Sequence, residues 1–86
     1  MSWKELSFVL RGKQRKQVLL ALNQPMTATM LSQQLKTHRS TISEILLILE
    51  KKKLVLCLDP DQPHTRFYKR TQKGDLIKEE VQKIKS

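Results

Sequence analysis

Residues 37–55, THRSTISEILLILEKKKLV, constrain the fold more than any other part of the sequence. Four apolar residues recur there at intervals of three and four, which places them on one face of an α-helix. They are Ile42, Ile45, Leu46 and Leu49. The pattern predicts a helix over residues 39–52 that buries this face against a hydrophobic core.

Two short helices are predicted at the start of the chain. A capping box between Ser2 and Glu5 begins the first, which runs over residues 3–10. The second spans residues 13–22, and Asn23 is the expected left-handed residue at its end. Both segments carry apolar residues on one side, so we expect each helix to pack against the core.

A helix-turn-helix is predicted in the middle of the chain. Thr27 is the expected N-cap of a helix over residues 28–35. Residues 36–38 form a tight turn before the helix over residues 39–52. A connection this short suits two helices that cross steeply.

The hydrophobic period changes to two after the lysines at 51–53, which predicts a β-hairpin. The expected strands span residues 54–58 and 66–70. The intervening DPDQPH is typical of a turn, and we interpret Asp59 and Asp61 as turn formers.

Thr71 is the expected N-cap of a final helix over residues 72–85. The order of elements predicts a mainly α fold with a small β-hairpin, in the α+β class. A chain of 86 residues is expected to form one domain. We divide residues 1–86 into an N-terminal helix (1–11), a core with the hairpin (12–71) and a C-terminal helix (72–86).

The charge is strongly unbalanced, with 17 Lys and Arg against 8 Asp and Glu and a net charge of +9. A domain this basic attracts polyanions, chiefly nucleic acid or an anionic membrane surface. A dense group of cations lies at Arg11, Lys13, Arg15 and Lys16. No apolar stretch approaches the roughly 20 residues that cross a bilayer, so no membrane span is expected.

The residues offer little chemistry beyond binding. Cys57 is the only cysteine, so no internal disulfide is expected, and we predict a cytoplasmic location. Cys57 and His64 lack the paired spacing of a zinc site, and we interpret His38 as a helix cap. No acid, base and nucleophile converge, so we expect no enzyme activity, metal or cofactor. A small-molecule effector is not expected in a chain this short, although that alternative stays open.

The second helix of the helix-turn-helix presents small hydroxyl side chains opposite its apolar face. Ser40, Thr41 and Ser43 can hydrogen-bond base edges or phosphates, and a helix with small side chains fits the major groove. Arg39 can reach a phosphate or a guanine. Glu44 can accept from a cytosine amino group but repels phosphates.

The preceding helix offers a seat for phosphate at its N-terminus, near Thr27 and Thr29. A plainer interpretation is that hydroxyl residues at helix starts serve only as caps. The hairpin and the basic excess, taken together with these hydroxyls, favour nucleic-acid binding.

The sequence resembles winged helix-turn-helix transcriptional regulators of the small MarR-like or ArsR-like kind common in archaea. The resemblance rests on TATMLSQQL, HRSTISEILLILEKKKLV and RFYKRTQKG in this order, over residues 12–74. It implies a winged helix with extra N-terminal and C-terminal helices. It also implies a DNA-binding homodimer, with one helix in the major groove and the hairpin, or wing, beside it.

The resemblance also implies roles for single residues. The expected DNA-binding residues come from the helix-turn-helix and the hairpin: Thr27, Thr29, Lys36, Thr37, Arg39, Ser40, Thr41, Ser43, Glu44, Arg66 and Lys69. Gly74 would let the last helix approach the core closely. Four residues depart from the family pattern: Lys36 replaces a frequent glycine, Thr37 a usual apolar residue, Glu44 a frequent arginine, and Arg70 a typical apolar residue. We expect Arg70, at the base of the hairpin, to contact DNA as well.

A homodimer is expected because the terminal helices carry apolar stripes beyond what a tiny monomer needs. The predicted interface residues are Trp3, Leu6, Leu10, Ile77, Val81 and Ile84. The predicted function is that of a sequence-specific transcriptional regulator that binds double-stranded DNA. The alternatives are a non-specific architectural DNA-binding protein and a winged-helix module that binds proteins in a transcription or replication complex.

Overall fold

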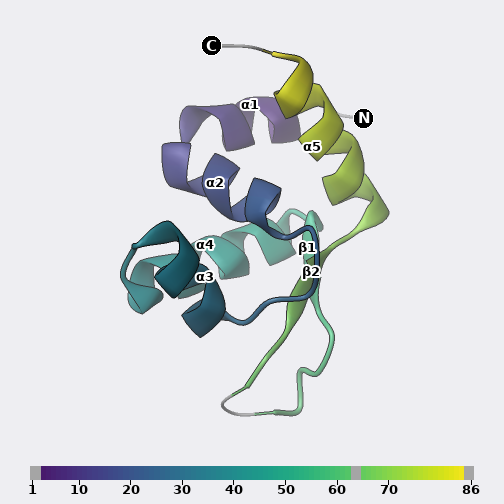
Figure 1. Cartoon of the computed structure of the whole chain (residues 1–86). Coiled ribbons are helices and arrows are strands. Elements are labelled where there is room, and N and C mark those ends of the chain that lie inside the picture. Colours follow the sequence, from purple (N-terminus) through teal and green to yellow (C-terminus); the bar gives the residue numbers. More distant parts are fainter. Residues whose placement is uncertain (1–2, 63–64, 85–86) are drawn as a thin grey trace.

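Five helices and a two-stranded antiparallel hairpin form the part of the chain that the computed structural model describes, residues 3–62 and 65–84. The elements are α1 (Trp3–Arg11), α2 (Lys13–Ala21), α3 (Ala28–Leu35), α4 (Arg39–Lys51), β1 (Val55–Cys57), β2 (Tyr68–Arg70) and α5 (Gln72–Lys83). Figure 1 shows α1 and α5 at one end of the molecule and the hairpin, here called the wing, projecting from the other. The predicted α+β fold is confirmed.

Local capping explains where two of the helices begin. The Thr27 hydroxyl oxygen accepts a hydrogen bond from the Met30 backbone N–H at 3.1 Å, as a residue at the N-cap of α3 should. The Thr71 hydroxyl accepts in the same way from the Gly74 N–H at 3.0 Å. Both predicted caps are confirmed, whereas the predicted cap at Ser2 lies outside the described residues.

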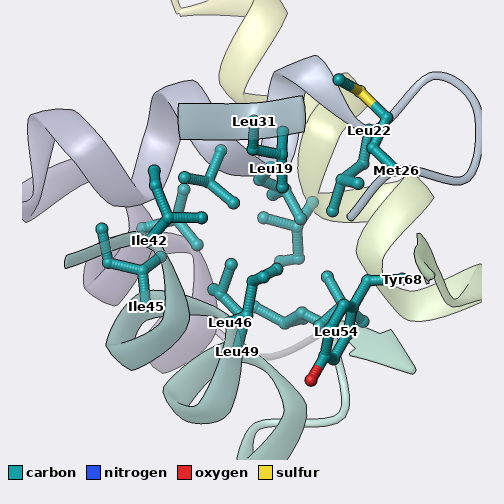
Figure 2. Packing of buried hydrophobic residues seen from close by; sticks show 14 of the residues in the cluster. Leu19, Leu22, Met26, Leu31, Ile42, Ile45, Leu46, Leu49, Leu54 and Tyr68 are labelled. Carbon is teal, nitrogen blue, oxygen red and sulfur yellow. The ribbon is translucent and has the colours of Figure 1, made fainter. Parts of the chain in front are cut away.

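The core draws side chains from every helix and from both strands. The four apolar residues predicted to face inward from α4 are all buried. Figure 2 shows Ile42 and Leu46 of α4 pointing toward Leu19 of α2 and Leu31 of α3. Both helices of the helix-turn-helix therefore pack against α2. Among the described residues, no helix is both long enough and apolar enough to cross a membrane.

The wing sheet gains a short third member that the sequence did not predict. β1 and β2 pair antiparallel, with Val55 opposite Arg70 and Cys57 opposite Tyr68. Met26, just before α3, exchanges two backbone hydrogen bonds with Tyr68, at 2.9 and 3.0 Å. This bridge ties the start of the helix-turn-helix to the wing.

Two predictions near the wing are wrong. Asn23 does not end α2 in the left-handed conformation, because the C-cap is Leu22 and positive φ angles among non-glycine residues occur only at Lys36 and Lys53 in the described chain. Arg70 does not face solvent, since its side chain is only 7% exposed. The two residues are joined to each other instead. The Arg70 guanidinium donates to the Asn23 side-chain oxygen at 3.0 Å and to the Leu19 carbonyl at 2.7 Å.

Gly74 lies where α5 meets the buried residue Leu54, just before β1, in keeping with the close approach to the core that the resemblance implied. A side-chain carbon at this position would collide with the carbonyl oxygen of Leu54. The absence of a side chain therefore sets how closely α5 packs against the wing.

Candidate nucleic-acid interface

The N-terminus of α3 carries backbone N–H groups that the helix itself cannot satisfy. The first N–H groups of any helix lack partners within it, and a cap supplies only one acceptor. The Thr27 cap takes the Met30 N–H, which leaves Ala28 and Thr29 at the entrance to the helix. Thr29 is exposed. This end of α3 therefore has the geometry of an anion-binding site.

The turn between α3 and α4 depends on a strained residue. Lys36 ends α3 in the left-handed conformation, with φ 54° and ψ 46°, a region that favours glycine. The Thr37 hydroxyl donates to the Leu35 carbonyl at 3.2 Å. Thr37 therefore stabilises the turn, and Lys36 stands exposed beside it.

The first turns of α4 turn their small polar side chains outward, as predicted. Arg39, Ser40 and Glu44 are exposed, while Thr41 and Ser43 are half-buried. His38 occupies the N-cap position, but its side chain makes no capping hydrogen bond. The N-terminal half of α4 is thus open to a ligand.

The wing is braced from within by Asp59. Its carboxylate accepts from the Phe67 N–H at 2.9 Å, and its backbone carbonyl accepts from the Gln62 N–H at 3.1 Å. The Arg66 Nε then donates to the Gln62 carbonyl at 2.7 Å. Asp59 is confirmed as a turn former, and this chain of contacts sets the position of the exposed Arg66.

These three elements meet around one groove of about 280 Å³. It is lined by residues of the α3 N-terminus, the outer side of α4 and the wing. The lining residues are Thr27, Ala28, Thr29, Arg39, Ser43, Leu46, Leu47, Arg66 and Tyr68. Five predicted DNA-binding residues, far apart in sequence, therefore share one surface. We call this surface the reading groove.

The other predicted residues lie outside the reading groove. Thr41 and Glu44 line a separate hollow with residues of α2, on a neighbouring side of α4. Ser40 is exposed at the start of α4, and Lys69 is exposed on β2. Lys36 and Thr37 lie in the turn between α3 and α4.

Four residues that line the reading groove are not among the predicted DNA-binding residues: Ala28, Leu46, Leu47 and Tyr68. Leu47 is 51% exposed, four residues after Ser43 on the same side of α4. Tyr68 lines the groove while being largely buried, and burial raises the pKa of its phenol above the ordinary value. The charges of Cys57 and Glu50 raise it further. The helical period of α4 predicts Leu47 on the face opposite the apolar stripe, and its exposure confirms this, but its place beside the wing depends on the tertiary structure.

The predicted dimer residues divide into two groups. Leu6, Ile77 and Val81 are buried in the chain's own core, where α1 packs against α5, and Leu10 packs at the edge of that core. Trp3 and Ile84 are exposed, by 70% and 45%, and Leu76 of α5 is exposed by 46%. The apolar stripes of the terminal helices thus serve first to hold the monomer together.

Metal-binding geometry is lacking in the described part of the chain. Within residues 3–62 and 65–84, no three His, Cys, Asp or Glu side chains cluster as metal ligands would. His64, one of the imagined ligands, lies outside these residues.

The chain resembles several solved structures, although no family model and no curated protein matches it. A MarR-family transcription regulator named SP03579 is 25% identical with a TM-score of 0.75, over 87% of this chain and 54% of that one. Reduced MarR from E. coli is 22% identical with a TM-score of 0.77, over 93% of this chain and 61% of that one. Reduced HlyU from Vibrio cholerae is 23% identical with a TM-score of 0.70, over 92% of this chain and 84% of that one.

These similarities identify the fold as the winged helix found in MarR-family regulators, and the similar structures are transcription regulators rather than enzymes. The chain spans about half the length of several of them, for example 51% of Lactococcus lactis ZitR.

Proposed function

We propose that this chain binds double-stranded DNA as a sequence-specific transcription regulator, with α4 in the major groove. The observation that carries the proposal is the reading groove, in which a helix N-terminus, a hydroxyl-rich helix and the arginine of a wing converge. A helix N-terminus and arginine suit phosphates, whereas serine on α4 suits base edges. Similarity to MarR-family regulators supports the same function.

The roles follow from the position of each residue. Thr27 and Thr29 would receive a phosphate at the start of α3, and Arg66 would hold the backbone beside the wing. Arg39 and Ser43 line the same groove from α4, the helix proposed for the major groove, so they would face the edges of the bases. Leu47 would add an apolar surface, which suits the methyl group of thymine.

Selection of bound duplexes from a random library tests this function. We expect an enriched motif, with Arg39→Ala weakening binding to it by about tenfold or more. Ser40→Ala and Thr41→Ala should broaden the motif more than they weaken binding. Lys83→Ala on α5 is the control, because Lys83 pairs with Glu80 far along the chain from the reading groove. Enrichment of no motif would reject sequence specificity and favour an architectural binder.

We also propose that the active form is a homodimer that pairs through the end of the molecule formed by α1 and α5. Exposed apolar side chains there are Trp3 of α1, Leu76 of α5 and Ile84, which directly follows α5. A symmetric pair would place two α4 helices about 34 Å apart, one turn of the duplex. Sedimentation should show a dimer for the native chain and a monomer for Leu76→Ser with Ile84→Ser. A native monomer at working concentration would refute this part of the proposal.

A protein-binding module is a second candidate function, and Leu47 favours it. An exposed leucine beside the exposed Glu44 is unusual on a helix that meets phosphates. Failure of the chain to retard any duplex at low salt would favour this second function over the first.

A further inference from the structure

A second basic surface lies away from the reading groove and goes beyond the proposed function. A groove of about 580 Å³ runs between α1, α2 and the end of α4. It is lined by Trp3, Lys4, Ser7, Phe8, Arg11, Arg15 and Lys52. Four of these seven side chains are cationic and none is acidic. We call this surface the basic groove.

Three of the four cations of the basic groove, Arg11, Arg15 and Lys52, take no part in the ion pairs found in the described residues. Among residues 3–62 and 65–84, the ion pairs join Arg70 to Asp75, Lys73 to Glu5 and Lys83 to Glu80. None of them includes Arg11, Arg15 or Lys52. Cations held close together without carboxylates repel one another, and a bound polyanion would relieve that repulsion.

Two of these cations are held in place around one aromatic ring. The Arg15 guanidinium lies over the Phe8 ring at 4.1 Å from its centroid, and its Nη1 donates to the Phe8 carbonyl at 2.9 Å. The Lys52 ammonium lies 5.2 Å from the same centroid. An arginine fixed in this way keeps donors in a planar fork that matches phosphate, and it loses little entropy on binding.

The basic groove and the reading groove belong to opposite sides of α4. Ser43 lines the reading groove and Lys52 the basic groove, nine residues apart. Nine residues at 3.6 per turn correspond to a rotation of about 180°. A straight duplex bound in the reading groove would therefore not contact Lys52, which lies on the opposite side of α4.

We propose that the basic groove binds the sugar–phosphate backbone of a second DNA duplex, so that the protein bridges two duplexes. Backbone contacts by lysine and arginine need no particular sequence, and their strength depends on how many phosphates are neutralised. A membrane surface fits less well, because Arg15 and Lys52 cover the Phe8 ring that would otherwise insert into lipid. Trp3 also lines the basic groove, but we assign it to the proposed dimer surface. The proposal of a second duplex therefore depends on the cations alone.

A two-duplex capture experiment tests the bridge. One duplex is fixed to beads through biotin, the full chain is added, and retention of a second, fluorescent duplex is measured. Binding to a single duplex is measured in parallel by anisotropy. The triple variant Arg11→Gln, Arg15→Gln and Lys52→Gln should lower retention by about tenfold or more, since it removes three phosphate contacts. Its affinity for a single duplex should stay within about twofold.

Two matched variants make the outcome specific. Lys13→Gln, Lys51→Gln and Lys83→Gln remove the same charge outside the basic groove and should leave retention unchanged. Because Arg15 also holds α1, the double variant Arg11→Gln and Lys52→Gln should lower retention while leaving the melting temperature unchanged.

Several results would overturn the bridge without touching the proposed function. Retention that survives in the triple variant would assign bridging to the dimer, with each protomer holding one duplex. If the triple variant lost single-duplex affinity as strongly as retention, the three cations would belong to the same DNA-binding surface as the reading groove. Absence of a bridge in the native chain, with binding to vesicles containing anionic lipid, would assign the groove to a membrane. Failure of the native chain to bind even one duplex would instead refute the proposed function.

Discussion

Tyr68 links three parts of the molecule at the scale of one residue. Its backbone pairs with Met26 before α3, its ring packs in the core, and its side chain borders the reading groove. Burial raises the pKa of the phenol, so Tyr68 stays neutral and can donate a hydrogen bond wherever DNA is stable.

The raised pKa of Tyr68 predicts a loss of stability at alkaline pH. A folded-state pKa above the unfolded value means that the unfolded chain loses its proton first. The contribution to stability is complete below the unfolded pKa of about 10 and is lost as the pH rises through the folded value. Tyr68 is the only tyrosine, so ultraviolet titration of tyrosinate reports it alone. The stability of the native chain relative to Tyr68→Phe should be constant near neutral pH and should fall above a pH of about 10. A tyrosinate titration at the ordinary pKa would contradict this.

Arg70 is a buried cation that holds elements of the fold together. It donates to the Leu19 carbonyl and Asn23 side chain near the end of α2, and its Nε donates to Asp75 of α5 at 2.8 Å. Asp75 is 60% exposed, so the ion pair itself contributes little. The hydrogen bonds to the buried end of α2 carry most of the effect.

Arg70→Ala should therefore lower the free energy of unfolding by on the order of 3 kcal/mol, because it removes the buried guanidinium together with its hydrogen bonds to the Leu19 carbonyl and the Asn23 side chain. Arg70→Lys should recover part of this loss, since it keeps a donor without the planar fork. Urea denaturation measures both variants. DNA affinity, measured well below the melting temperature, should change little. A selective loss of affinity at full stability would return Arg70 to the interface.

At the scale of elements, the turn between α3 and α4 sets the direction of α4, and it does so at a cost in stability. Lys36 adopts a left-handed conformation that costs a residue with a side chain about 1–2 kcal/mol. Glycine adopts it without this strain. A lysine here keeps a positive charge beside the proposed DNA surface.

Lys36→Gly should raise the free energy of unfolding by about 1 kcal/mol and weaken DNA binding modestly. The matched control is Lys52→Gly, because Lys52 is right-handed at φ −81° and glycine there should not stabilise the chain. Denaturant curves and anisotropy titrations separate the two effects. Destabilisation by Lys36→Gly would show that the lysine side chain makes a contact worth more than the strain.

At the scale of the whole molecule, the net charge of +9 is distributed over more than one surface. Arg39 and Arg66 border the reading groove, whereas Arg11, Arg15 and Lys52 border the basic groove. Long-range attraction draws DNA to the whole protein, but only cations that touch phosphates release counterions on binding.

The salt dependence of affinity should therefore separate contact residues from the general field. Arg66→Gln should flatten the log–log slope for a single duplex by about 0.9, because Arg66 is proposed to hold one phosphate. Arg39→Gln should change the slope less, because Arg39 is proposed to face the bases. Lys83→Gln removes the same charge from α5 and should leave the slope unchanged. Anisotropy titrations over a range of salt measure all three. Equal effects from the three variants would mean that net charge alone controls binding.

Sequence by itself determined the order of elements, the inward face of α4 and the caps at Thr27 and Thr71. These features depend on periodicity and on hydrogen bonds within a few residues, so local chemistry is sufficient to predict them.

The tertiary structure alone decided what depends on distant partners. It paired Met26 with Tyr68, buried Arg70 against α2, and turned the apolar residues Leu6 and Ile77 into monomer core rather than free surface. Alternation in a strand tells which residues share a face, but not which face is covered. Whether a side chain is buried depends on the element that packs over it, and that contact is set by segments many residues away.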